Sequence, residues 1–181
     1  YVLSKVLSFQ LHKAINGGKV QAESNTYGTN ICFPGDQWVT MASGKHKQLS
    51  EITKGDRIIT IGTDHKPITT EVTALVAHAA DNYAVTELLL LKSIENKTSF
   101  GTEVQLQTKT LTATPNHPVA SAGIRKTMGE IVIGEKLLCY DECTSNYMTY
   151  TVWNTIQKSG GKQKVYNVEL AGGNNLLINN V

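Results

Sequence analysis

An internal repeat constrains the fold of this chain more than any other feature. The segment Gly44–Ile59 recurs as the segment Gly123–Leu138 at a constant offset of 79 residues (123 − 44 = 79 and 134 − 55 = 79). Gly, Lys, Glu, Ile and Gly are identical in the two copies, and an acidic, a basic and two aliphatic residues follow in both. A repeat kept in register indicates one supersecondary unit built twice, and neither copy can bury its apolar face alone. We therefore expect two copies packed around a pseudo-two-fold axis.

The rest of the chain consists of short apolar and β-branched runs separated by Gly, Asp and Asn. This pattern predicts strands and little helix. The expected strands are 38–41, 57–61, 71–78, 85–91, 104–112, 119–122, 136–140, 148–156, 164–170 and 176–178. Brief helical pieces are expected only at 47–52 and 127–131. The sequence thus predicts an all-β domain with short helical turns.

Charge and cysteine content exclude several classes of function. A net charge of +2, without a basic run or an apolar run long enough to span a bilayer, gives no reason to expect nucleic acid or a membrane as partner. The cysteines Cys32, Cys139 and Cys143 lack the paired spacing of a zinc site. Cys139 and Cys143 are near enough in sequence to pair, although core or surface thiols are the simpler expectation. We expect a monomer without metal or cofactor.

A cysteine next to a Pro-Gly break marks a candidate reactive site. Cys32 precedes Pro34 and Gly35, directly before the alternating run that begins at Gln37. Its thiolate can attack the carbonyl of Ile31 through a five-membered ring, with proximity supplied by covalent connection. The alternative is a small buried hydrophobe, as most free cysteines are.

The repeat also suggests where a partner for this thiol lies. The offset of 79 carries the strand that begins near Asp36 onto the strand that begins near Pro115, within the stretch Thr114–His117. Equivalent strand starts are neighbours around a pseudo-dyad, so a thiol and an imidazole far apart in sequence can converge there. A nucleophile beside an acid or base is the arrangement needed for covalent catalysis.

At these residues the chain resembles the Hint superfamily, the self-processing domains shared by inteins, bacterial intein-like domains and the Hedgehog autoprocessing domain. Cys32–Gly35 is similar to the opening block of the family, and Lys47–Ile59 to the segment that closes it. Thr114–His117 matches a Thr-x-x-His motif, and Lys164–Leu170 resembles the late Val-Tyr-Asp strand. The resemblance covers residues 32–181 and implies a pseudo-two-fold, horseshoe-shaped all-β fold.

The resemblance implies roles for three residues at the Ile31–Cys32 bond. Cys32 would be the nucleophile of an N-to-S acyl shift, and His117 would protonate the leaving nitrogen, which suits imidazole near neutral pH. Thr114 would bind and distort the amide. The alternatives are a structural histidine at 117 and a turn-capping hydroxyl at 114. Catalysis requires these side chains to cluster where the two halves meet.

The C-terminal part departs from the intein pattern. Asn167 stands where intein-like domains usually carry Asp, and it is a further candidate site residue that cannot ionise. Neither Asn179 nor Asn180 lies where the family has its terminal His-Asn pair, and the given sequence ends at Val181. We therefore expect the N-terminal step without the C-terminal one.

The function expected from the sequence is single-turnover autoprocessing by the domain 32–181. Its substrate would be the upstream polypeptide that includes residues 1–31, and water or a small nucleophile would open the thioester. One alternative is a non-catalytic Hint-fold structural or display module. Another is a splicing intein truncated at its C-terminus. A cysteine protease acting in trans is disfavoured, because the sequence shows no third, orienting residue.

Overall fold

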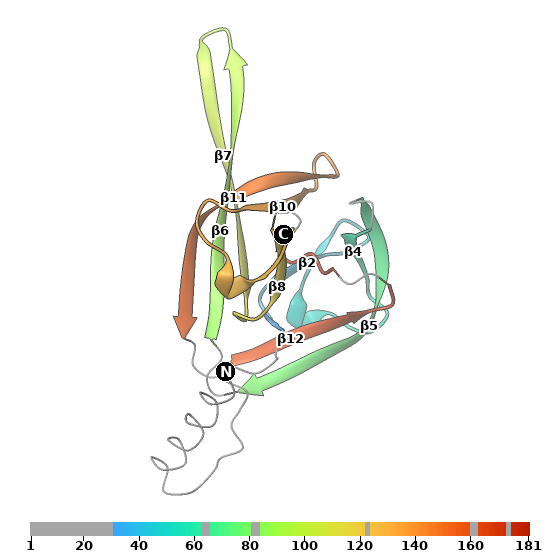
Figure 1. Ribbon diagram of the computed structural model, residues 1–181. Helices are drawn as coiled ribbons and strands as arrows, with labels where there is room; N and C mark the ends of the chain where they lie inside the picture. Colours follow the sequence, from blue (N-terminus) through green and yellow to red (C-terminus); the bar gives the residue numbers. More distant parts are fainter. Residues whose placement is uncertain (1–30, 63–65, 81–83, 122–123, 160–162, 173–174) are drawn as a thin grey trace, which may run out of the picture.

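The computed structural model describes residues 31–62, 66–80, 84–121, 124–159, 163–172 and 175–181 (Figure 1). Almost all of its regular structure is β. The strands are β1 (Phe33–Pro34), β2 (Trp38–Thr40), β3 (His46–Gln48), β4 (Arg57–Ile61), β5 (Pro67–Ala80), β6 (Ala84–Thr98), β7 (Gly101–Ala113), β8 (Pro118–Ser121), β9 (Ile124–Thr127), β10 (Lys136–Asp141), β11 (Asn146–Ser159) and β12 (Gln163–Leu170). Two short 3₁₀ helices, η1 (Leu49–Glu51) and η2 (Met128–Glu130), lie within the two expected helical pieces.

The predicted all-β class with short helical turns is confirmed. One expected strand is wrong, because the run 176–178 forms only a single antiparallel bridge, between Ile178 and Val39 of β2. In the described part of the chain, no helix is long and apolar enough to cross a membrane.

The strands form three curled antiparallel sheets. The four-stranded sheet has the order β1-β12-β5-β4, and the six-stranded sheet has the order β7-β6-β11-β10-β8-β9. A small two-stranded sheet is made by β2 and β3. Because β1 and β7 are terminal strands of different sheets, the segments next to them can meet where the sheets approach each other.

The pseudo-two-fold relation between the repeat copies is visible in corresponding backbone details. Gly55 and Gly134 both have φ of 92°, so the same tight turn is made twice. In the first copy the glycine N–H donates to Val72 O at 2.9 Å, and in the second to Val152 O at 2.9 Å. The expected duplication is therefore confirmed at the level of individual hydrogen bonds.

Both copies contribute to one hydrophobic core. Each 3₁₀ helix begins with a fully buried side chain, Leu49 in η1 and Met128 in η2, and both belong to the same cluster. Ile58 of β4 and Leu137 of β10 are corresponding buried residues of that cluster. Since the apolar faces of the copies cover each other, neither copy has a complete core alone, as the repeat predicted.

The two repeat glycines provide a test of this symmetry. An alanine at positive φ places its Cβ against its own backbone, so Gly55→Ala and Gly134→Ala should each lower the free energy of unfolding by about 1–2 kcal/mol. Urea denaturation measures both losses, which should be equal because the turns are equivalent. Gly172→Ala is the control, because its added methyl group also meets open space but its φ lies outside the left-handed region. A large loss at one repeat glycine only would contradict the equivalence.

Candidate active site around Cys32

Cys32 and Thr114 are joined by two hydrogen bonds although 82 residues separate them in sequence. The N–H of Cys32 donates to Thr114 Oγ1 at 3.1 Å, and the N–H of Thr114 donates to the carbonyl of Cys32 at 2.9 Å. Cys32 lies just before β1 and Thr114 just after β7, and both residues are buried. The N–H of the Ile31–Cys32 peptide bond is thus held by a side chain from the other half of the fold.

His117 is fixed beside this pair by its backbone and its ring. Its N–H donates to Thr114 O at 2.9 Å, and its carbonyl accepts the N–H of Met128 at 2.8 Å. The imidazole packs against Phe33, the residue after Cys32, with 4.0 Å between ring centroids. The structure therefore brings Cys32, Thr114 and His117 together, while their chemical roles remain a prediction.

Burial keeps the Cys32 and His117 side chains uncharged. Burial lowers the pKa of His117 to about 4 and raises the pKa of the Cys32 thiol to about 11. The Nδ1 atom of His117 is buried and has no hydrogen-bond partner among the described residues. At neutral pH the site thus holds a protonated Cys32 thiol and a neutral His117 imidazole, whose Nδ1 is unpaired among the described residues.

The pseudo-dyad indicates what the His117 side chain faces. Gln37 is the structural counterpart of His117 (37 + 80 = 117). The carbonyl of Gln37 accepts the first N–H of η1 at 2.8 Å, and the carbonyl of His117 accepts the first N–H of η2 at 2.8 Å. The Gln37 side chain accepts the N–H of Thr112 at 3.3 Å. Thr112 is the counterpart of Cys32 (32 + 80 = 112), so under the pseudo-dyad the neighbour of His117 that corresponds to Thr112 is Cys32. The N–H of Cys32 itself donates to Thr114 Oγ1. Sequence analysis missed Gln37.

The repeat offset of 79 did not reveal Gln37, because the offset differs by one residue in this part of the chain. In the segment that leads into and includes β2 in the first copy and β8 in the second, the offset is 80, so Asp36 corresponds to Asn116 and not to Pro115. The registers show why: Thr40 pairs with His46 in the first copy, whereas Ala120 pairs with Arg125 in the second. The second turn is one residue shorter, which returns the offset to 79 beyond it.

Asn167 occupies the strand next to Cys32. Phe33 of β1 lies opposite Tyr166 of β12, and continuing this register by one residue sets Asn167 opposite Cys32. The Oδ1 atom of Asn167 accepts the N–H of Val168 at 2.9 Å. The late-strand candidate is thus next to the thiol along the backbone, with an amide in place of a carboxylate.

Gly35 is required by the close packing of this strand pair. A Cβ at position 35 would lie 2.5 Å from Cε2 of Tyr166 and 2.9 Å from Cβ of Ser50. Real Cβ atoms do not approach so closely, so only glycine allows the chain to pass between β12 and η1 at this point. The Pro-Gly break next to Cys32 therefore has a packing reason.

The C-terminal segment is fastened to β2 near the same junction. Asn179 exchanges two hydrogen bonds of 2.8 Å with the backbone of Trp38, and its Nδ2 donates to Gln37 Oε1 at 2.9 Å. Asn180 accepts from Thr40 Oγ1 at 2.7 Å. Both asparagines thus hold the C-terminal segment against the domain.

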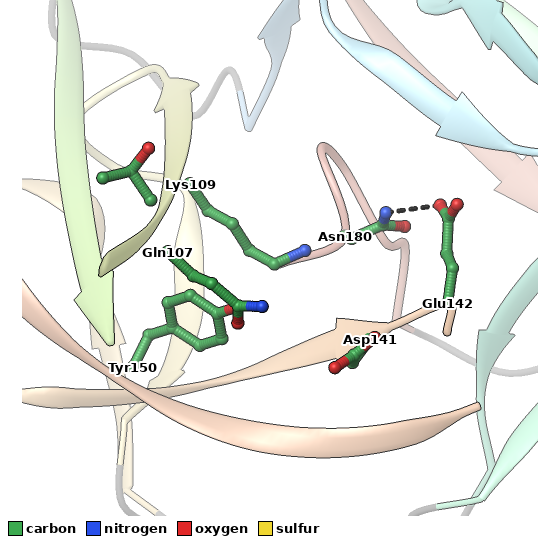
Figure 2. Close-up of a pocket in the computed structure, with 7 residues that line it drawn as sticks. Gln107, Lys109, Asp141, Glu142, Tyr150 and Asn180 are labelled. Atoms are coloured by element: carbon green, nitrogen blue, oxygen red, sulfur yellow. Dashed lines mark hydrogen bonds between the residues drawn. The ribbon is translucent and has the colours of Figure 1, made fainter. Parts of the chain in front are cut away.

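A polar pocket of about 320 Å³ lies beside this C-terminal segment (Figure 2). It is lined by Gln107, Thr108, Lys109, Asp141, Glu142, Tyr150 and Asn180. Lys109 donates to Tyr140 O at 2.9 Å, and Asn180 Nδ2 donates to Glu142 Oε1 at 2.6 Å. None of the expected catalytic residues lines this pocket.

The two remaining cysteines do not form a disulfide with each other. Cys139 is buried in β10 and Cys143 is exposed in the following turn, and both thiols are free, as is that of Cys32. Burial raises the pKa of Cys139 to about 12, so its thiol stays protonated. The expectation of a core thiol and a surface thiol is confirmed.

Comparison with solved structures identifies the architecture as that of inteins. The DnaB intein of Synechocystis sp. PCC 6803 is 18% identical and superposes with a TM-score of 0.60, over 83% of this chain and 94% of that one. The bacterial intein-like domain from Clostridium thermocellum is 17% identical with a TM-score of 0.60, over 83% and 94%. An intein from a hyperthermophile is 15% identical with a TM-score of 0.62, over 82% and 95%.

The chain belongs to the Hint family, because residues 20–122 match the Hint module. A search of curated proteins found no match. The matched region includes Cys32, Thr114 and His117, and the structure has the horseshoe-shaped Hint fold expected from the sequence. Family and fold together support a self-processing domain in general, either autoproteolytic or splicing.

The low pKa of His117 leads to a prediction about pH. Because the ring titrates at about 4 in the folded protein and at 6.5 in the unfolded chain, the unfolded state binds more protons between these values. The stability that depends on the neutral ring is complete above pH 6.5 and declines as the pH falls toward 4. NMR of the imidazole signals should show His117 titrating near pH 4. In His117→Gln, the part of the acid-induced loss of stability that the His117 ring causes should be absent. Titration of His117 near its ordinary value would contradict its burial.

Proposed function

We propose that this domain cleaves its own chain once, at the Ile31–Cys32 bond, through an N-to-S acyl shift. The observation that carries the proposal is the hydrogen bond from the Cys32 N–H to Thr114 Oγ1. It holds the nitrogen of the scissile amide while the thiol is attached to the same residue. Ile31 is 39% exposed and Cys32 is 1% exposed, so the bond lies where the chain enters the domain.

The protonation states support a role for His117 as base first and acid second. The thiol starts protonated and the imidazole neutral, so Nδ1 can take the thiol proton as sulfur attacks the Ile31 carbonyl. The C–N bond then breaks, and the imidazolium gives the same proton to the Cys32 nitrogen. The products are a thioester and a free amine, and no proton is gained or lost overall.

A second nucleophile completes the cleavage. Water attacks the thioester carbonyl, releases the acid at Ile31 and returns the Cys32 thiol, and an amine or another thiol reacts at the same carbon. The substrate is thus the polypeptide upstream of Cys32, including residues 1–31, and residues 32–181 are the processing domain. Neither step calls for a metal or cofactor.

Asn167 supports cleavage without splicing. Splicing needs a later cyclisation of a terminal asparagine and acid–base assistance to it. The amide of Asn167 cannot ionise, and its Oδ1 is bound to the next backbone N–H. We therefore propose that the N-terminal step occurs without the C-terminal one.

One observation favours a second candidate, an inert structural or display module. The Cys32 thiol is buried and its pKa is raised to about 11, as for structural cysteines that do not react. The two candidates differ in whether His117 deprotonates the thiol during attack. Kinetics on the folded protein separate them.

The proposal predicts that the purified folded protein splits at Ile31–Cys32 when dithiothreitol or hydroxylamine is added, because thioesters yield to external thiols and amines and amides do not. Cys32→Ala should abolish the cleavage. His117→Ala should slow it by about 10²–10⁴-fold. Thr114→Val should slow it by roughly tenfold or more, since it leaves a buried N–H unpaired. Mass spectrometry of the fragments gives the rates.

Cys143→Ala is the matched control, because it removes an exposed thiol outside the site and should cleave at the parent rate. Cys139→Ala should also cleave if it keeps its fold. Circular dichroism establishes that each variant is folded. An intact chain under these conditions, with folded parent protein, would overturn the proposal in favour of the inert module.

A further inference from the structure

The hairpin of β6 and β7 extends well beyond the body of the domain and forms an arm (Figure 1). We define the arm as Lys92–Gln107, the part of the hairpin whose strands pair only with each other. Phe100 at its tip is fully exposed, and Val104 and Leu106 of β7 are each 60% exposed. Neither the core nor the candidate active site accounts for this arm.

The outer edge of β7 is covered where the strand crosses the body. Three even-numbered positions direct backbone groups to this edge and have partners there: Thr114 N–H with Cys32 O, Thr112 N–H with Gln37 Oε1, and Thr110 C=O with Asn179 Nδ2. The body half of the edge is therefore occupied by the active-site and C-terminal segments.

The same alternation leaves the remaining edge open. In an antiparallel hairpin every second residue turns its N–H and C=O away from the partner strand. The even-numbered residues Thr102, Val104, Leu106 and Thr108 thus also face outward. Among the residues that the structure describes, no strand lies on this side, since β7 ends the order of its sheet. Such an edge is a template for another strand.

The open segment has a sequence that reads almost the same in both directions. Thr102-Glu-Val-Gln-Leu-Gln-Thr108 is centred on Gln105, so threonine faces threonine, glutamate faces glutamine and valine faces leucine when two copies run antiparallel. This register also sets outward-facing residues opposite each other, Thr102 with Thr108 and Val104 with Leu106. Every outward N–H and C=O of the segment would then be paired.

We propose that two copies of this protein associate by antiparallel pairing of their β7 edges around a two-fold axis through Gln105. Val104 lies opposite the partner's Leu106 on one face of the joined sheet, and these side chains cover each other's exposed apolar surface. Glu103 lies opposite the partner's Gln107, so no like charges meet. From the sequence we expected a monomer, whereas the β7 edge favours a dimer.

The other open edge of the arm shows what distinguishes β7. Ser93, Glu95 and Lys97 of β6 face outward there, and two of the three carry charge. Charged side chains on an edge strand disfavour pairing with another chain. The outward residues of β7 in the arm carry none, so the copies pair through β7.

Proline variants test the edge directly. Leu106→Pro removes an outward N–H of β7, and Glu95→Pro removes an outward N–H of β6, while neither interrupts the ladder within the hairpin. Sedimentation of the full chain over a range of concentrations should give twice the monomer mass for the parent and for Glu95→Pro. Leu106→Pro should give the monomer mass, with unchanged circular dichroism. A monomeric parent throughout, or a Leu106→Pro dimer, would overturn the proposal.

A cysteine placed on the axis tests the register. In a Cys143→Ser background, Gln105→Cys sets two thiols directly opposite each other at a non-hydrogen-bonded position, where antiparallel strands bring Cα atoms within disulfide range. Mild oxidation should convert most of this variant to a covalent dimer. Glu103→Cys is the control, because its two copies lie two residues to either side of the axis and should cross-link little. Equal cross-linking of the two variants would rule out this register.

Discussion

The two hydrogen bonds between Cys32 and Thr114 are the interaction on which the candidate site depends. They join the end of β7 to the start of β1, and so connect the six-stranded sheet to the four-stranded one. They also hold the amide that the proposed reaction cleaves. Because the N–H of Cys32 is buried, the Thr114 hydroxyl removes the cost of leaving it unpaired and fixes the position of the nitrogen at the same time. The same Thr114 hydroxyl therefore stabilises the fold and positions the nitrogen for the proposed reaction.

Duplication explains how such a site arises from one supersecondary unit. The same turn, 3₁₀ helix and strand are built twice, and corresponding backbone hydrogen bonds at the 3₁₀ helices and the glycine turns agree to about a tenth of an ångström. The copies differ where Gln37 stands in one and His117 in the other. The Gln37 side chain has three hydrogen-bond partners, Asp36, Thr112 and Asn179, whereas Nδ1 of His117 has none among the described residues. A site with pseudo-two-fold symmetry thus becomes chemically one-sided, with a hydrogen-bonded amide side chain in one half and, in the other, the unpaired imidazole to which we assign proton transfer.

Much of this architecture could be predicted from the sequence, and the limits have physical causes. A repeat in register requires two units that cover each other, which led to the duplicated all-β fold and to the approach of Thr114 and His117 to Cys32. The length of the β6–β7 arm could not be predicted, because its outer residues bury nothing and only pairing defines them. The shorter second turn hid the equivalence of Gln37 and His117. The pKa of His117 depends on how deeply the folded chain buries its ring, which the sequence does not specify.

The central claim is that the Ile31–Cys32 amide becomes a thioester in the folded protein. Ile-Cys occurs only once in the sequence, so labelling isoleucine carbonyls with ¹³C and cysteine nitrogens with ¹⁵N makes this peptide bond visible alone by NMR. The claim predicts that, after a thiol is added, the Ile31–Cys32 correlation decays at the rate at which the upstream fragment appears, and that the carbonyl signal moves to the thioester region. A correlation that keeps its full intensity in the folded, thiol-treated protein would contradict it.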